Sequence, residues 1–165
     1  MKRENTMKKL LPMLLLAVPS LAGAHAEILQ KDAESGSYYK GVIGISHGCE
    51  GSATTKVTIS IPYGVRGAKP MPKPGWKLDV VKSELEKPYQ SHGKTVTEDV
   101  TQITWYGGVL ESEHYDEFVF RGQIGVGTTT RLYFPVKQEC VVGEVSWDQK
   151  PGDKPKGHDH HGEHH

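Results

Sequence analysis

The sequence lacks the motifs of most familiar enzymes and nucleic-acid-binding proteins. It contains no nucleophile elbow, phosphate-binding loop, H-E-x-x-H motif or internal repeat. No segment keeps a sustained 3.6-residue hydrophobic period, which argues against a helical protein. Lys plus Arg (20) equal Asp plus Glu (20), so the basic excess that favours nucleic-acid binding is missing. The two cysteines do not form a C-x-x-C pair.

The first 24 residues have the order of a secretory signal peptide. A positive segment is followed by an apolar run at 10–18 and by the cleavage motif Ala22-Gly23-Ala24. That run is too short to span a bilayer, and no second run is long enough for a membrane anchor. We predict cleavage after Ala24 and a periplasmic or secreted protein. Cleavage after Ala22 or Ala26 remains an alternative.

The predicted mature chain, residues 25–165, carries 16 Lys and Arg against 19 Asp and Glu, a net charge of −3 with His neutral. We assign 25–150 to one folded domain, a length that suits a single core. Residues 151–165 contain no large apolar side chain, so we predict a disordered tail. The tail forms a loose auxiliary site for Cu(II), Ni(II) or Zn(II) through His158, His160, His161, His164 and His165.

The folded part is predicted to be all-β. Thr55–Ile61 shows the clearest alternation, with Val57 and Ile59 on one face. We predict strands at Tyr38–Ser46, Thr55–Ile61, Trp76–Val81, Val96–Tyr106, Glu117–Ile124, Thr129–Val136 and Val141–Trp147. The segment 96–106 changes phase midway, which indicates a bulge or two strands. Residues 70–75 form a stiff connection and Gly107-Gly108 a turn. About seven to eight antiparallel strands predict a two-sheet β-sandwich, with barrel closure as the alternative.

Cys49 and Cys140 are predicted to form a disulfide, because an exported chain with an even cysteine count meets an oxidising compartment. Closing a loop of roughly 90 residues would contribute about 4 kcal/mol in the chain-entropy model. The alternative is a cysteine pair that binds a soft metal.

His25 becomes the first residue if cleavage follows Ala24. Its free α-amine and its imidazole Nδ1 then chelate one metal ion without any loop having to fold between them. This donor set suits Cu(II), which prefers nitrogen ligands in a tetragonal plane. The alternative is that a His merely follows the signal peptide.

From His25 onward the sequence resembles the YcnI-like family of exported copper-binding domains, over residues 25 to about 148. The resemblance rests on HAEI (25–28), GSYY (36–39), HGCEGSATT (47–55), PMPKPGW (70–76), YDEF followed by FRG (115–122), and LYFP (132–135) leading to Cys140. It implies a cupredoxin-like or immunoglobulin-like sandwich that binds copper through its N-terminal His in a monohistidine brace, with a carboxylate and a Trp nearby.

Carried over by position, the resemblance makes His25 the brace residue and Trp147 the tryptophan near the metal. The carboxylate position of the family does not match cleanly, because the loop before the Thr-Thr pair here begins with His47. We favour His47 as the second ligand, with Glu50 and Glu27 as further candidates. His47 also has a simpler interpretation as a solvent-facing loop residue.

The remaining residues of interest are given structural roles. Trp76, Trp105 and Met71 are assigned to packing, and His92 and His114 to solvated segments. The acidic cluster Glu111, Glu113, Asp116 and Glu117 is interpreted as a solvated loop with Arg121 as a partner.

The function expected is therefore copper buffering, trafficking or delivery, to a copper transporter or another copper chaperone, without enzymatic activity. Two alternatives stay open. One is a copper-dependent redox enzyme in which His47 completes a full brace, although no aromatic stripe suited to a polymer surface is evident. The other is an adhesion sandwich with incidental histidines.

Overall fold

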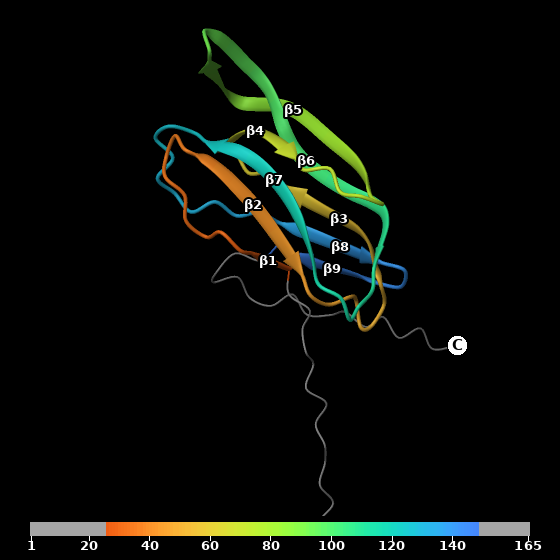
Figure 1. The fold of residues 1–165 in the computed structure, drawn as a ribbon. Helices are drawn as coiled ribbons and strands as arrows, with labels where there is room; N and C mark the ends of the chain where they lie inside the picture. The colour runs from red at the N-terminus through yellow and green to blue at the C-terminus, as the bar shows by residue number, and fades with distance from the viewer. Residues whose placement is uncertain (1–25, 149–165) are drawn as a thin grey trace, which may run out of the picture.

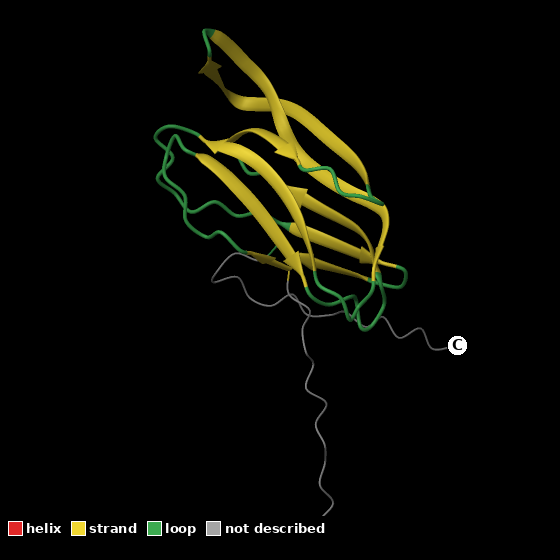
Figure 2. Ribbon diagram, in the orientation of Figure 1, coloured by secondary structure: helices red, strands yellow, loops and turns green. Residues whose placement is uncertain are grey.

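The computed structural model describes residues 26–148, and these form two antiparallel sheets packed face to face (Figures 1 and 2). The four-stranded sheet has the order β1-β2-β7-β4, with β1 Ala26–Ile28, β2 Tyr38–Ile45, β7 Asp116–Ile124 and β4 Val65–Pro70. The five-stranded sheet has the order β5-β6-β3-β8-β9, with β5 Lys77–Ser91, β6 Lys94–Leu110, β3 Thr54–Ser60, β8 Val136–Cys140 and β9 Glu144–Trp147. The predicted two-sheet sandwich is confirmed, with nine strands in the described residues. No helix long and apolar enough to cross a membrane occurs among them.

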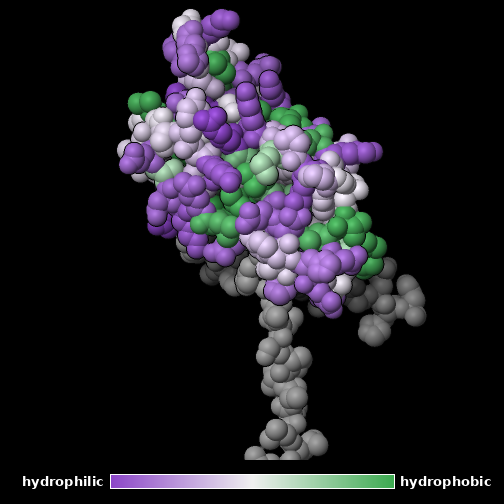
Figure 3. Space-filling model, in the orientation of Figure 1, coloured by the Kyte–Doolittle hydropathy of each residue, from purple (hydrophilic) through white to green (hydrophobic). Residues whose placement is uncertain are grey.

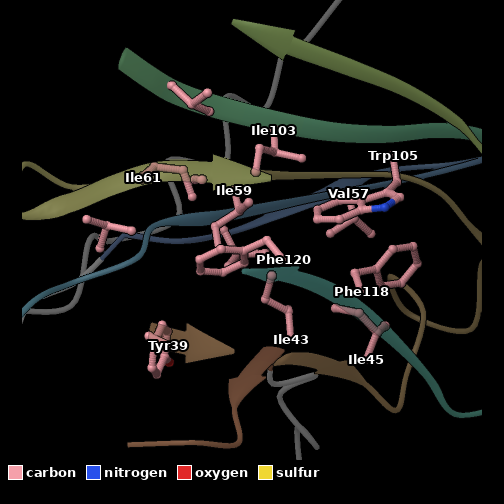
Figure 4. Packing of buried hydrophobic residues seen from close by; sticks show 14 of the residues in the cluster. Tyr39, Ile43, Ile45, Val57, Ile59, Ile61, Ile103, Trp105, Phe118 and Phe120 are labelled. Atoms are coloured by element: carbon pink, nitrogen blue, oxygen red, sulfur yellow. The ribbon is translucent and has the colours of Figure 1, made fainter. Parts of the chain in front are cut away.

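The core lies between the sheets and is built by the alternation of β2, β3, β6 and β7. Ile43 and Ile45 point inward from one sheet, and Val57 and Ile59 from the other. The largest fully buried side chains, Trp105, Phe118 and Phe120, lie in the same cluster (Figure 4). Trp105 and Phe118 contact each other edge to face, with ring centres 5.7 Å apart. The assignment of Trp105 to packing is confirmed.

Strand β6 continues through the two glycines that the sequence analysis took for a turn. The phase change within the predicted 96–106 strand is a bulge in one long strand, where the pairing of β5 with β6 shifts register between Val81 and Lys82. The predicted turn at Gly107-Gly108 was wrong. Gly107 has a φ of 78°, and the pairing of β3 with β6 shifts register between Thr54 and Lys56. Gly108 is required because a Cβ there would lie 2.2 Å from the Trp76 ring. A bulge stacked under Trp76 replaces the expected turn.

The C-terminal strands differ most from the prediction. Residues 129–135 form a loop whose Leu132 and Phe134 pack against the core without pairing in a sheet. Apolar alternation there reflects burial, not a strand. The predicted strand 141–147 is present as β9, but only from Glu144 to Trp147, and it pairs with β8 in a hairpin. Val141 and Val142 lie at its turn and are exposed.

The proline-rich connection is held against both sheets by its backbone. The Met71 N–H donates to the Val119 carbonyl (2.7 Å), and the Trp105 Nε1–H donates to the Met71 carbonyl (3.1 Å). The Met71 side chain itself is 54% exposed, so its assignment to packing was wrong. Lys73 anchors the same loop by an ion pair with Asp116.

Candidate metal centre

The short strand β1 begins beside the end of β2. Ala26 pairs with Ile45 and Ile28 with Ile43, in antiparallel register. Ala26 and Ile28 face the core, which holds this edge strand in place. His25 lies outside the described residues, as do the predicted signal peptide and the histidine tail. Ala26 thus lies at the end of the strand pair where β2 leads, two residues after Ile45, to His47.

His47 lies in a loop that folds back on itself within a few residues. Cys49 and Ser52 exchange two backbone hydrogen bonds, of 3.1 and 2.9 Å, around Glu50 and Gly51. Both turn residues have positive φ, 48° and 85°, as a two-residue hairpin turn of type I′ requires. Gly48 is confined as well, because a Cβ there would lie 1.8 Å from the Ser52 carbonyl oxygen. This local geometry leaves the loop little freedom.

The predicted disulfide is confirmed and fixes the same loop to β8. Cys49 and Cys140 are bonded across a sequence separation of 91 residues. Among the residues that the structure describes, no free cysteine remains. The soft-metal alternative for this cysteine pair is therefore excluded in this structure.

Gln138 supplies a second anchor, which the sequence analysis missed. Its side chain is 1% exposed, and its Nε2 donates to the His47 carbonyl (2.7 Å) and to the Thr54 hydroxyl (2.7 Å). The signal was present: alternation from Val136 places this amide at an inward position, where an unpaired polar group would be costly. On the other side, Gly48 donates its N–H to Ser112 Oγ (3.1 Å). The His47 side chain remains exposed on this fixed backbone.

The two carboxylate candidates belong to different elements, a strand and a turn. Glu27, on the outer face of β1, forms an ion pair with Lys31 (3.0 Å), and Glu50 occupies the tip of the Cys49–Ser52 turn. Near Glu27, Tyr115 covers Gly44 and donates its hydroxyl hydrogen to Glu117 (2.8 Å). That hydrogen bond raises the pKa of Tyr115.

Trp147 ends β9, where it pairs with Val136 and packs against the core. Trp147 therefore has a structural role in core packing. His92, at the tip of the β5–β6 hairpin, and His114 are exposed, as expected. Arg121, in contrast, lies over the Tyr38 ring, whereas Lys73 is the cation that pairs with Asp116. The proposed partnership of Arg121 with the acidic cluster was wrong.

Within residues 26–148, no group of three His, Cys, Asp or Glu side chains is arranged to hold a metal ion. His47 offers one imidazole on a rigid loop, and neither Glu27 nor Glu50 joins it in such a group.

Fold and site together define an immunoglobulin-like β-sandwich with a disulfide-fixed loop at the end where its first strand begins. A solved structure supports the fold: the chain resembles an uncharacterized protein from Nocardia farcinica whose crystal structure reveals an immunoglobulin-like fold. The two are 23% identical, with a TM-score of 0.56, over 81% of this chain and 89% of the other. The chain belongs to the DUF1775 family, described as a domain of unknown function, whose profile matches residues 25–164. No curated protein matches significantly.

Proposed function

We propose that this chain is an exported copper-binding protein that holds Cu(II) at the end of the sandwich where β1 begins. The observation that carries the proposal is the register of β1 with β2, which places Ala26 opposite Ile45, two residues before His47. Cleavage after Ala24 would add a free α-amine and the His25 imidazole directly before Ala26. Three nitrogen donors then become available, a set that suits Cu(II).

The fit of the site to copper rests on the loop that carries His47. Its carbonyl is held by Gln138 and its neighbour Cys49 by the disulfide, so a ligand there loses little freedom on binding. The proposal is supported by the two histidines and by the family resemblance. In the proposed site, His25 and His47 bind the ion, and Glu27, Glu50 or a water completes its coordination. Trp147 would limit solvent near the metal, in keeping with the same resemblance.

We further propose that the protein buffers or delivers copper in the periplasm or outside the cell and is not an enzyme. Its partners would be a copper transporter or another copper chaperone. The His-rich tail would act as a second, less selective store. An enzyme would instead give an ascorbate-dependent oxidation product from a polysaccharide in the presence of copper, and detection of such a product would replace this proposal.

The test uses the mature domain, residues 25–150, so that the histidine tail does not mask the folded site. All nine described strands end by Trp147, within this span. Cu(II) affinity is measured by competition titration for the parent, for His25→Ala and for His47→Ala, with exposed His92→Ala as the control. We expect His25→Ala to weaken binding well over tenfold and His92→Ala to leave it unchanged. Unchanged affinity in His25→Ala would reject the site.

The mature N-terminus is checked separately by intact mass spectrometry of protein recovered from its native compartment. Cleavage after Ala24 gives the amine–imidazole chelate, and cleavage after Ala22 gives another chelate through Gly23-Ala24-His25. A chain that begins at Glu27 would remove His25 and refute the proposal.

A further inference from the structure

Three cations form a row across the outer face of the four-stranded sheet. None of them takes part in the proposed copper site. In the antiparallel register, Lys40 on β2 is opposite Arg121 on β7, and Arg121 is opposite Lys69 on β4. Opposite residues of an antiparallel pair share a face, and all three side chains are exposed. With strands about 4.8 Å apart, the row spans roughly 10 Å.

This row has no acidic counterpart within residues 26–148. No carboxylate oxygen there lies within 4.0 Å of a side-chain nitrogen of Lys40, Lys69 or Arg121. Like charges placed directly opposite each other destabilise a sheet. The predicted mature chain is acidic overall, with a net charge of −3, so the row is not part of a generally basic surface. The sequence thus keeps a local repulsion that one acidic substitution would relieve.

The neighbours of the row are of the kind found in protein interfaces. The Arg121 guanidinium lies 3.9 Å from the centre of the Tyr38 ring, and Tyr38 is 64% exposed. Met71, whose N–H is bonded to β7, is also exposed. Tyr, Met and Arg are enriched at protein interfaces relative to the rest of the surface. Figure 3 shows an apolar area bordered by hydrophilic side chains on this face of the molecule.

We propose that this cationic face (Tyr38, Lys40, Lys69, Met71 and Arg121) docks a partner protein that presents a row of carboxylates. The planar guanidinium of Arg121, steadied by Tyr38, suits bidentate binding of one carboxylate. Lys40 and Lys69 flank it and attract further acidic groups, which speeds encounter and fixes orientation. A negatively charged bilayer is the less favoured occupant, because lipid-binding patches gather about 4–8 Lys or Arg residues and this row holds three. The proposal does not depend on copper.

The binding test uses the mature chain, residues 25–165, and a dye-labelled synthetic peptide in which glutamates alternate with threonines. The face variant carries Lys40→Gln, Lys69→Gln and Arg121→Gln. The control carries Lys82→Gln, Lys87→Gln and Lys94→Gln, which remove the same charge from exposed positions of the β5–β6 hairpin. We expect the face variant to raise the dissociation constant of the peptide at least tenfold. The control variant should change it less than twofold. Equal effects of the two variants, or no binding by the parent, would overturn the proposal.

A parallel arm replaces the peptide with vesicles of phosphatidylcholine containing phosphatidylglycerol. Face-dependent binding to vesicles without peptide binding would replace the protein partner with a membrane. Light scattering of the parent chain tests for a second copy as the occupant, since a dimer abolished by the face variant would likewise overturn the proposal.

A second variant separates binding from folding. Lys40→Glu with Lys69→Glu converts the two repulsive pairs with Arg121 into attractive ones. We expect the thermal midpoint to rise while the peptide affinity falls at least as far as in the face variant. A lowered midpoint would contradict the inference that the parent retains an unrelieved repulsion.

Discussion

Replacement of Gln138 by Met tests whether a buried amide fixes the loop that carries His47. The two side chains have similar length and volume, so the substitution leaves no large cavity. It removes both hydrogen bonds of Nε2, to the His47 carbonyl and to the Thr54 hydroxyl. Thr54 is fully buried, so water cannot replace this partner, and its hydroxyl keeps only a 3.9 Å contact with Cys140 Sγ.

The expected cost follows from these two partners. A buried polar group left unsatisfied lowers the free energy of unfolding by about 1–3 kcal/mol. A carbonyl that exchanges its protein partner for water lowers it by about 1 kcal/mol at most. His47 is exposed, so we place its carbonyl in the second class and expect a total of about 2–3 kcal/mol. For a domain of this size that corresponds to a fall in the thermal midpoint of about 5–10 °C.

The assay is urea unfolding followed by tryptophan fluorescence, together with Cu(II) titration of the mature domain. Gln102→Met serves as the control, because Gln102 lies half-buried on β6 and no side-chain hydrogen bond of it is found in the described structure. Its stability should change by less than about 0.5 kcal/mol. If Gln138→Met were as stable as this control, the amide would not hold the loop, and the rigidity argument for His47 would fail.

Two further predictions concern stability. Reduction of the Cys49–Cys140 disulfide, or replacement of both cysteines by Ala, should lower the free energy of unfolding by up to about 4 kcal/mol. Urea unfolding with and without reductant measures this change. An unchanged unfolding midpoint would show that the loop is fixed without the disulfide. Burial, with a hydrogen bond to Asp99, raises the pKa of Tyr89 to about 12 from its usual 10. Because the folded-state pKa is the higher one, the stability linked to Tyr89 is present below pH 10 and is lost as the pH rises towards 12. Comparison of the parent with Tyr89→Phe at pH 9 and pH 11.5 should show a smaller loss in the variant, whereas equal losses would contradict this assignment.

The sheet architecture could be predicted from the sequence wherever one face of a strand is buried. Alternation located β2, β3 and β7 to within one residue at each end, because their inward residues fill the core. It failed at β1, which is three residues long, and at β4, where a glycine and two cations interrupt any pattern. It also mistook the loop at 129–135 for a strand, since Leu132 and Phe134 are packed on the core without sheet pairing.

The candidate site could be predicted only in part. Cysteine parity predicted the disulfide, which is confirmed, whereas the family resemblance pointed only to the loop that carries His47 and Glu50, whose role as ligands stays a prediction. Gln138 lies 91 residues from His47, and only the pairing of β3 with β8 brings the two together. Long-range register of this kind is not encoded in local patterns. The row of Lys40, Lys69 and Arg121 escaped notice for the same reason, because it exists only across three strands.

The two proposed nitrogen-bearing residues divide the requirements of a copper site between them. Ordering a loop costs about 1–2 kcal/mol per residue, and here the turn, the disulfide and Gln138 supply that order during folding. The backbone at His47 therefore needs no further ordering when a metal ion binds. The residue before Ala26 does not depend on a preordered loop, because an amine and an imidazole on one residue close a chelate without help from the fold. If this division is correct, Gln138→Met should reduce copper affinity through His47 alone, and the double variant Gln138→Met with His47→Ala should bind copper no more weakly than His47→Ala. A further loss in the double variant would show that Gln138 acts on the site by another route.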